Sequence, residues 1–453
     1  MQRTLLRADT IVTMDDTRRI ICGGGIVING RIIEAVLNAE QVATGRFAGE
    51  VVELGGRVLI PGFIQTHLHL CQTLFRGLAD ELELLDWLRM RIFPLEAAHT
   101  ASSMAASATI GIAELIRSGT TTILDMGSVQ HEDSIVRTLE ETGLRAFVGK
   151  AMMDLNPSCP TLQETTREAL LSTREQVKLW HGSAGGRIRY AVAPRFVLSC
   201  SEELLRGAFA LTAEFPGVLF HTHAAENRRE MDAVRTRCGV DNIEYFESIG
   251  VLRQNTCLAH CIWLNDREMG LMSEHQAKVL HCPSSNLKLA SGVAKVPEML
   301  ARGIAVSLGA DGAPCNNTLN MFEEMRLASL IQKPLHGPGA MPARIPVEMA
   351  TRGGAVALGI LPEAGSLEAG KNADIVALNL DRCWNGVQST AGDGIYSALV
   401  YSSSAEIVCD VIIDGTWVFR NGRHLTLDEE RAVHTAREEL RHLLSRAKIH
   451  GLT

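Results

Sequence analysis

The stretch GFIQTHLHLCQTLFRG, residues 62–77, joins an apolar run to two histidines, His67 and His69, that stand two positions apart. Side chains two positions apart in a β-strand point to the same side. The two imidazoles would therefore lie next to each other at the end of a water-excluded strand. Such a pair indicates part of a metal site, whose other ligands must come from elsewhere in the chain.

Eight short apolar or β-branched runs, the first of which overlaps the start of this stretch, alternate with helical patterns such as ASSMAASATIGIAELIRSG (101–119). Eight strand–helix repeats with buried strands predict an α/β fold, the (β/α)8 TIM barrel. A doubly wound sheet is the alternative, but no Gly-x-Gly-x-x-Gly motif follows the first strand. The predicted strands span residues 58–67, 119–126, 144–153, 187–196, 217–223, 255–261, 277–282 and 303–311.

Both ends of the chain read as short strands with tight turns. Asn29-Gly30, Asp414-Gly415 and Asn421-Gly422 are strong hairpin signals. We therefore expect one small β-sandwich domain built from both chain ends, and a charged helical segment after it. The predicted parts are 1–56 and 373–425 for the β-sandwich, 57–372 for the barrel and 426–453 for the helical segment.

Composition excludes several classes of protein. The 453 residues carry a net charge of -8, which argues against a nucleic-acid partner. No uncharged apolar run is long enough for a transmembrane helix, and the N-terminus lacks the apolar core of a signal peptide. A cytoplasmic location without membrane contact is expected. None of the 11 cysteines forms a CxxC pair, so a thiolate metal site is disfavoured.

Polar side chains are concentrated at the ends of the predicted strands, where the chemistry of such barrels lies. Three histidines and one carboxylate would suit a borderline-soft divalent ion such as zinc or ferrous iron, in an open mouth with room for water. An ion held in this way lowers the pKa of its bound water toward about 7, which gives hydroxide at neutral pH. The residues at the strand ends are His67, His69, Arg195, His221, His223, Glu226, His260, His281 and Asp311.

Three of these residues have a predicted part in catalysis. Glu226 lies three positions after His223, so it could take a proton from the water and pass it to the substrate. His260 could polarise the water or the oxygen of a tetrahedral adduct. Asp311 could ligate the metal, accept a proton, or both.

The segments PGFIQTHLHL, HTHAAEN, LAHC, HCPSSNLKLASG and LGADGAPCNN together resemble the metal-dependent amidohydrolase superfamily. The likeness is closer to its aminohydrolase branch, which holds S-adenosylhomocysteine, 5'-methylthioadenosine and 5'-deoxyadenosine deaminases, guanine deaminase and triazine chlorohydrolases. It covers nearly the whole chain. The resemblance implies a hydrolase acting on C–N bonds other than peptide bonds, in which water adds to a ring carbon that bears an amino group and ammonia leaves.

The resemblance also assigns residues. It implies that one divalent ion per chain, zinc first and iron or manganese as alternatives, is held by four ligands, while Glu226 shuttles the proton and His260 contacts the attacking water. Members with two metals carry a modified lysine after strand four, where this chain has Arg195, so a mononuclear site follows. The implied ligands are His67, His69, His223 and Asp311, and the implied pocket residues are His281, Ser285 and Asn286.

The substrate clues conflict. RGLADELELLDWLRMRIFPLEAAHT (76–100) resembles the nucleoside deaminases, with Trp87 and Glu96 matching their substrate-facing residues, and Glu96 would pair with the ring edge of an amino-purine. In that branch a Glu two residues before the Trp holds the ribose hydroxyls. Leu85 stands at that position here, although Glu81, Glu83 or Asp86 could substitute.

PRFVLSCSEELL (194–205) instead resembles guanine deaminase, with Arg195, Phe196 and Gln72 matching residues that hold guanine, and Gln72 also matches the triazine hydrolases. The preferred substrate is an adenosine-type 5'-modified nucleoside, namely 5'-deoxyadenosine, methylthioadenosine or S-adenosylhomocysteine. Guanine deaminase, a triazine chlorohydrolase or aminohydrolase, and a non-catalytic scaffold are the alternatives. Beyond a small-molecule substrate and water, the expected partner is another copy of the chain in a homo-oligomer.

Overall fold

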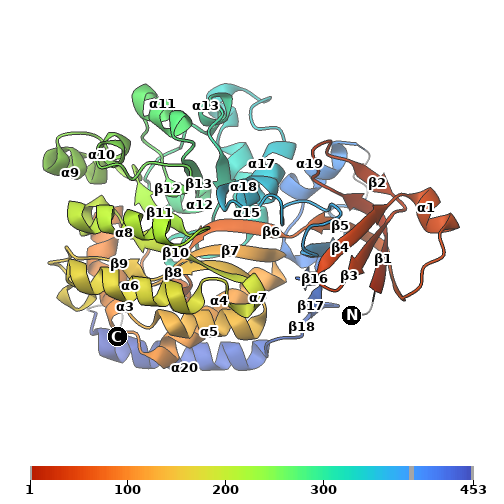
Figure 1. The fold of residues 1–453 in the computed structure, drawn as a ribbon, viewed down its shortest axis with the longest axis horizontal. Coiled ribbons are helices and arrows are strands. Elements are labelled where there is room, and N and C mark those ends of the chain that lie inside the picture. The colour runs from red at the N-terminus through yellow and green to blue at the C-terminus, as the bar shows by residue number, and fades with distance from the viewer. Residues whose placement is uncertain (1–2, 387–391, 450–453) are drawn as a thin grey trace. The chain divides into compact units, whose positions relative to one another are not determined.

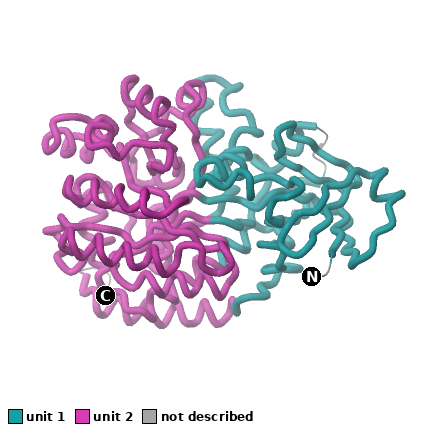
Figure 2. Tube along the Cα trace, viewed as in Figure 1, with its two compact units in different colours: residues 1–65, 113–122, 320–428 teal, residues 66–112, 123–319, 429–453 magenta. Residues whose placement is uncertain are grey.

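The computed structural model describes residues 3–386 and 392–449 and divides the chain into two compact units (Figure 2). Unit 1 comprises residues 1–65, 113–122 and 320–428, and unit 2 comprises residues 66–112, 123–319 and 429–453. Residues 1–2 and 450–453, which begin and end the predicted terminal segments, lie outside the described residues, as do residues 387–391 of the predicted second β-sandwich part. The predicted domain boundaries at residues 56, 372 and 425 stay predictions.

The parallel barrel predicted from the eight repeats is confirmed (Figure 1). Within the described residues its strands follow the order β14-β13-β12-β11-β10-β8-β7-β6, with the short β9 (Ala151–Met152) pairing with β10. The ring closes where Leu68 forms a parallel bridge with Asp311, whose amide donates to the carbonyl oxygen of His67 at 3.0 Å. The strands are β6 (Phe63–Leu68), β7 (Thr120–Met126), β8 (Arg145–Gly149), β10 (Ile188–Pro194), β11 (Leu219–Ala224), β12 (Thr256–His260), β13 (Lys278–His281) and β14 (Val306–Leu308).

The first predicted strand, 58–67, needs a correction. The structure divides it at Gly62, so that residues 58–61 end strand β5 (Glu50–Pro61) of the other sheet and only β6 enters the barrel. A Cβ atom at position 62 would lie 2.1 Å from Thr121 Oγ1, so only glycine fits this crossing. Because both strands are buried, the apolar run continues through Gly62. Hydrophobic periodicity therefore cannot show where β5 ends and β6 begins.

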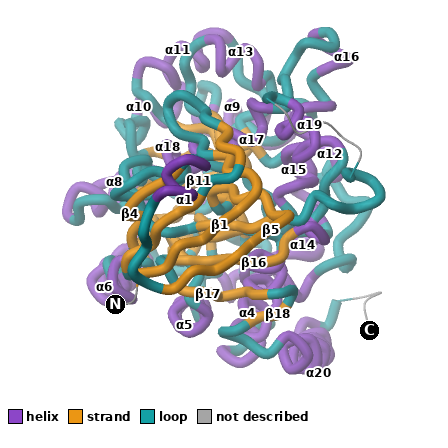
Figure 3. The backbone as a smooth tube through the Cα atoms, turned by 90° about the vertical axis from the view of Figure 1, so that its right-hand side faces the viewer, coloured by secondary structure: helices purple, strands orange, loops and turns teal. Residues whose placement is uncertain are grey.

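Unit 1 holds the sheet that both chain ends were predicted to share. In the described part of the chain its order is β18-β17-β16-β15-β5-β1-β3-β4, and β2 pairs with β1 (Figure 3). Asn421 and Gly422 have φ angles of 50° and 77°, as the hairpin signal requires. The strands are β1 (Arg3–Val12), β2 (Ile20–Cys22), β3 (Gly25–Asn29), β4 (Ile32–Leu37), β5, β15 (Ile375–Leu378), β16 (Val408–Ile413), β17 (Thr416–Arg420) and β18 (Arg423–His424). The helices of this unit are α1 (Ala39–Thr44), α15 (Met321–Leu330), α16 (Lys333–His336), α17 (Arg344–Ala350), α18 (Arg352–Ala357), α19 (Gly394–Tyr401) and the 3-10 turn η5 (Ala405–Ile407).

Helices and turns follow the barrel strands as the alternating pattern predicts. Among the described residues, no helix is both long enough and apolar enough to cross a membrane. The elements are η1 (Leu70–Phe75), α2 (Leu84–Trp87), the π-helix η2 (Leu88–Ile92), α3 (Phe93–Ala97), α4 (Ala101–Arg117), α5 (Glu132–Thr142), η3 (Pro160–Leu162), α6 (Thr166–Trp180), α7 (Ser183–Gly186), η4 (Val197–Ser199), α8 (Glu202–Glu214), α9 (Arg228–Cys238), α10 (Asn242–Ser248), α11 (Asp266–Glu274), α12 (Pro283–Lys288), α13 (Val296–Ala301), α14 (Ala313–Asn316) and α20 (Glu429–Ala447).

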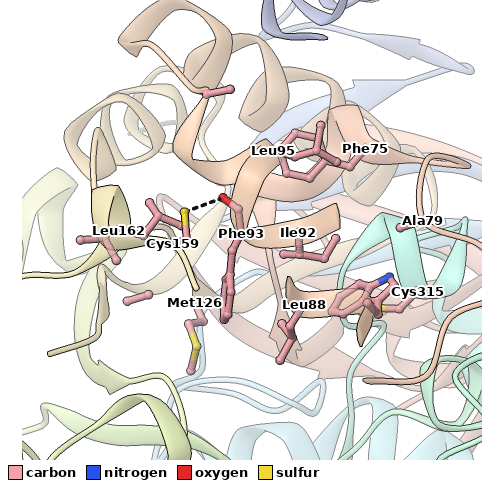
Figure 4. Close-up of a cluster of buried hydrophobic side chains, with 14 of the residues drawn as sticks. Phe75, Ala79, Leu88, Ile92, Phe93, Leu95, Met126, Cys159, Leu162 and Cys315 are labelled. Carbon is pink, nitrogen blue, oxygen red and sulfur yellow. Dashed lines mark hydrogen bonds between the residues drawn. The ribbon is translucent and has the colours of Figure 1, made fainter. Parts of the chain in front are cut away.

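A cluster of buried apolar side chains in unit 2 fixes the segment between β6 and α4 (Figure 4). Leu88, Ile92 and Phe93 of this segment belong to it, and the thiol of Cys159 donates to the carbonyl oxygen of Phe93 at 3.7 Å. Helix α20 contributes Ala436 and Leu443. The segment that was predicted to face the substrate is therefore held from behind by the core of its own unit.

Candidate active site

The predicted site residues lie at the carboxyl ends of the barrel strands, all within unit 2. His67 is in β6, His223 in β11, His260 ends β12, His281 ends β13, and Asp311 follows β14. Their side chains are largely buried because parallel barrel strands are covered on both faces. The strand order therefore brings together residues that are up to 244 positions apart in the sequence.

Five of these side chains direct nitrogen or oxygen atoms to one point. His67, His223, His260 and Asp311 each offer an atom, and these atoms all lie within 4.8 Å of one another. His69 Nε2 lies 3.3 Å from Asp311 Oδ1 and 3.3 Å from His223 Nε2, so it belongs to the same group. His67 Nε2 is 3.4 Å from Asp311 Oδ1. The four predicted ligands and His260 are thus assembled.

Hydrogen bonds behind the imidazoles orient them. His69 Nδ1 donates to the carbonyl oxygen of Met126 at 2.7 Å, and His223 Nδ1 donates to that of Arg195 at 2.7 Å. A carbonyl oxygen can only accept, so each ring keeps the lone pair of Nε2 for the site. His67 Nδ1 lies 2.8 Å from His221 Nε2. His221 is therefore a supporting residue of the site.

This donor set fits a divalent metal ion. His67 Nε2 and His260 Nε2 are buried, and within the described residues neither has a hydrogen-bond partner. Burial lowers the pKa of His67 to about 4, and it holds the pKa of His223 well below the usual value, so both rings are neutral near pH 7. Neutral imidazoles with a carboxylate are ligands that zinc, iron and manganese accept.

Glu226 lies beside this group. Its Oε2 is 3.5 Å from His260 Nε2, and its backbone amide donates to Glu230 Oε2 at 2.8 Å, at the start of α9. Ala225, with a φ angle of 50°, turns the chain between β11 and Glu226. Burial, together with the negative charge of Asp311, raises the pKa of the Glu226 carboxyl well above its usual range. A carboxyl of raised pKa can hold and release a proton near neutral pH.

A small hollow opens at these residues. Arg195 and Phe196 form one part of its wall, and Trp87 forms another. Leu84 and Leu88, which the sequence did not single out, complete the wall. Glu83 and Asp86 instead accept hydrogen bonds from Arg229 and do not line the hollow, and neither does Leu85.

Glu96 accepts hydrogen bonds from both Arg195 and Gln72. Arg195 Nη1 donates to Glu96 Oε2 at 2.8 Å and Nη2 donates to Oε1 at 3.0 Å, while Gln72 Nε2 donates to Oε1 at 2.8 Å. Both charged side chains are at most 2% exposed. The sequence assigned these residues to competing substrates, whereas the structure places them in one buried ion pair with a supporting amide.

Breaking this ion pair should cost far more stability than breaking an exposed one. Arg195→Met leaves the Glu96 carboxylate buried without its partner, which should lower the free energy of unfolding by about 3–5 kcal/mol. Arg206→Met, which removes the half-exposed pair with Glu202, should change it by less than about 1 kcal/mol. Urea unfolding of both variants measures the difference, and equal effects would show that the buried pair does not contribute in this way.

The HCPSSN segment supports other site residues. Ser285 Oγ donates to Asp311 Oδ2 at 2.6 Å, and Asn286 Oδ1 accepts from His260 Nδ1 at 2.8 Å. His281 is fully buried and does not line the hollow. These three residues were predicted to line the pocket, and that role remains a prediction.

Two buried histidines outside the ligand set predict a pH-dependent stability. Burial lowers the pKa of His99 to about 4 and that of His281 to about 3. The unfolded chain therefore binds more protons than the folded chain below about pH 6.5, and the free energy of unfolding should fall as pH decreases from there toward 4. The slope should approach about 1.4 kcal/mol per pH unit for each histidine well below pH 6.5, which amounts to a loss of about 1.4 kcal/mol for each histidine between pH 7.5 and 5.5. Urea unfolding at pH 7.5 and 5.5 measures this loss of stability.

His99→Gln should reduce the dependence of the free energy of unfolding on pH. His434→Gln, at an exposed position, should leave that dependence unchanged. An unchanged dependence in both variants contradicts the expectation.

Several contributing residues could not be found from the sequence. Asp125 accepts a hydrogen bond from the amide of Leu70 at 2.7 Å and so helps to fix the turn after His69. Leu84 and Leu88 look like ordinary core residues in the sequence. The only signal for them was their place in the segment that resembled the nucleoside deaminases.

Residues 58–418 match the Amidohydrolase family. A 5'-deoxyadenosine deaminase of Methanothermobacter thermautotrophicus is 41% identical over 420 residues, which cover 92% of this chain and 95% of that protein. A 5-methylthioadenosine/S-adenosylhomocysteine deaminase of Bacillus cereus is 36% identical over 440 residues, 96% of this chain and 98% of that protein. Among solved structures, an adenosine deaminase from Xanthomonas campestris with bound zinc matches with a TM-score of 0.90 and 27% identity, covering 98% of both chains.

The fold and the site thus define a metal-dependent hydrolase of the barrel type. The chain belongs to the amidohydrolase family. The resemblance that the sequence motifs indicated is confirmed.

Proposed function

We propose that this protein is a metal-dependent aminohydrolase that removes the amino group of an adenosine-type 5'-modified nucleoside. Water and the amino-purine give the corresponding oxo-purine and ammonia. The observation that supports this most directly is the position of Glu226 beside His260 and the donor group at the base of the hollow. The names of the two similar deaminases, which match more than nine-tenths of the chain, favour this substrate class.

His67, His69, His223 and Asp311 would hold one divalent ion, for which zinc is our choice and iron or manganese the alternatives. When bound, such an ion supplies an activated water for attack on the ring carbon. Oδ2 of Asp311 accepts a hydrogen bond from Ser285 Oγ, and this hydrogen bond fixes the plane of the carboxylate. His69 and His223 are held by backbone carbonyls, so that their Nε2 atoms stay directed at the site.

Glu226 moves the protons. Its carboxylate takes a proton from the attacking water, and its carboxyl passes that proton to the ring nitrogen next to the reacting carbon, where negative charge develops. His260, which Asn286 holds at Nδ1, lies near Glu226 and Asp311 and contacts the attacking water. The hydroxyl group of the tetrahedral adduct then gives up its proton, which reaches the amino group, and the C–N bond breaks so that ammonia leaves and the ring carbon keeps the oxygen.

The walls of the hollow bind the purine. Trp87 and Phe196 offer apolar ring surface, and the Glu96–Arg195 pair lies at the polar side of the ring. Three of the four lone pairs of Glu96 accept hydrogen bonds from Arg195 and Gln72, so Glu96 holds these two side chains in place. A cytoplasmic location and a homo-oligomeric assembly belong to the same proposal.

An ammonia-release screen tests the substrate class. We expect turnover of 5'-deoxyadenosine, methylthioadenosine and S-adenosylhomocysteine, with less or no turnover of guanine and of a chlorotriazine. Guanine is the second candidate because Arg195 lines the hollow and Gln72 donates to Glu96, the partner of Arg195. Turnover of guanine alone would contradict the proposal and favour a guanine deaminase. Release of chloride from the triazine, without release of ammonia from any purine, would contradict it and favour a triazine chlorohydrolase.

A further inference from the structure

The three histidines proposed to hold the metal differ in what holds their rings. His69 and His223 contact backbone carbonyl oxygens through Nδ1, each at 2.7 Å. His67 Nδ1 instead lies 2.8 Å from a side-chain atom, Nε2 of His221. The rings of His67 and His221 stand edge to face, with centroids 5.0 Å apart and an interplanar angle of 85°. Of these three histidines, His67 is therefore the one whose ring orientation depends on another side chain.

The contact between His67 and His221 crosses the interior of the barrel. His67 is in β6 and His221 is in β11. Strands β10, β8 and β7 separate them on one side, and β12, β13 and β14 separate them on the other, where the bridge between Leu68 and Asp311 closes the ring. His221 points to the same side of its strand as His223, two positions later. Strand β11 thus supplies one proposed ligand and also supports a second one on the opposite wall.

The direction of this hydrogen bond follows from the role of His67. A neutral imidazole has one N–H group and one lone pair, so a ring that binds a cation through Nε2 carries its proton on Nδ1. Nδ1 of His67 then donates to Nε2 of His221, and His221 carries its own proton on Nδ1. That nitrogen is buried, and it has no hydrogen-bond partner among the described residues. A buried donor without a protein partner costs stability, so packing alone does not explain a histidine at this position.

We propose that His221 is a positioning residue of the metal site, which fixes the tautomer and the orientation of His67 by accepting the hydrogen bond from its Nδ1. The inference rests on the proposed role of His67 as a ligand and deepens it. Partners of this kind raise the basicity of a ligand histidine and contribute about 10–100-fold to metal affinity.

Two substitutions at position 221 separate the hydrogen bond from packing. His221→Gln keeps an acceptor, the amide oxygen, whereas His221→Leu fills the space without one. Zinc affinity is measured on the metal-free proteins by competition with a chromophoric chelator. We expect His221→Leu to bind zinc about 10–100-fold more weakly than the wild type, and His221→Gln to stay within about threefold of it. An unchanged affinity in His221→Leu, or an equal loss in His221→Gln, overturns the inference.

His281→Leu is the matched control. His281 is also fully buried at the end of a barrel strand, and neither of its ring nitrogens has a hydrogen-bond partner in the described part of the chain. This variant should bind zinc as the wild type does. A loss equal to that of His221→Leu would overturn the inference, because a general disturbance of the interior would then explain both. Absence of zinc binding by the wild type would instead overturn the proposed function, and the inference with it.

A measurement on the wild type decides the question even if His221→Leu does not fold. Nuclear magnetic resonance of the zinc-loaded protein, labelled with ¹⁵N at histidine, reports which ring nitrogen carries the proton. We expect a proton on Nδ1 of both His67 and His221. A proton on Nε2 of His221 would overturn the inference, because that nitrogen could then not accept a hydrogen bond.

Discussion

Glu226→Gln should retain the metal and lose about 10²–10⁴-fold in kcat. Glutamine has the same shape and fills the same place beside His260, but it cannot take a proton from water or give one to a ring nitrogen. Since Glu226 is outside the group of atoms that converge within 4.8 Å, the variant should bind as much metal as the wild type. Ammonia release with the best substrate of the screen and metal analysis of the purified protein measure both effects.

The matched control is Glu247→Gln, the same change at an exposed position of α10. It should leave both kcat and metal content at the wild-type level. Near-normal turnover by Glu226→Gln would remove the proton shuttle from the mechanism, and loss of metal in that variant would show that Glu226 is a ligand.

Removal of the divalent metal should abolish turnover completely. The reacting end then has imidazole and carboxyl groups but nothing that generates a nucleophile near pH 7. Metal analysis should find one ion per chain, dialysis against a chelator should remove it together with the activity, and addition of Zn²⁺ should restore both. A lower melting temperature of the metal-free protein should accompany the loss, because an ion that binds only the folded chain stabilises it.

Two histidine variants separate ligands from neighbours. His67→Ala should reduce the metal content well below one ion per chain, since His67 Nε2 is buried and directed at Asp311. His281→Asn should keep the ion, because the ring of His281 is not among the converging donors. Equal metal content in both variants would be incompatible with the assigned ligand set.

The convergence of the proposed ligand residues could be predicted from the sequence because barrel geometry constrains it strongly. His67 and His69 share one side of one strand, and the carboxyl ends of parallel strands meet at one rim, so residues as distant as His223 and Asp311 converge. The order of the strands follows from the order of the repeats. Nothing in that argument depends on side-chain detail, which is why it holds.

The substrate contacts could not be predicted in the same way. Gln72, Glu96 and Arg195 were each matched to a ligand, and a sequence motif cannot reveal that three polar residues satisfy one another. The break at Gly62 was missed for a related reason, since an apolar run does not tell to which of two sheets its residues belong. Leu84 and Leu88 carry no chemical signature, and only their position identifies them as pocket wall.

The bridge between Leu68 and Asp311 closes the barrel at the place where two of the ligands stand. The amide of Asp311 donates to the carbonyl oxygen of His67, so the backbone of one ligand is tied directly to that of the other. Any motion that opens the ring at this seam separates the two donor side chains. Metal affinity and the free energy of local opening at the Leu68–Asp311 bridge are therefore linked. Metal binding should slow hydrogen exchange at the Asp311 amide more than at amides on the far side of the ring.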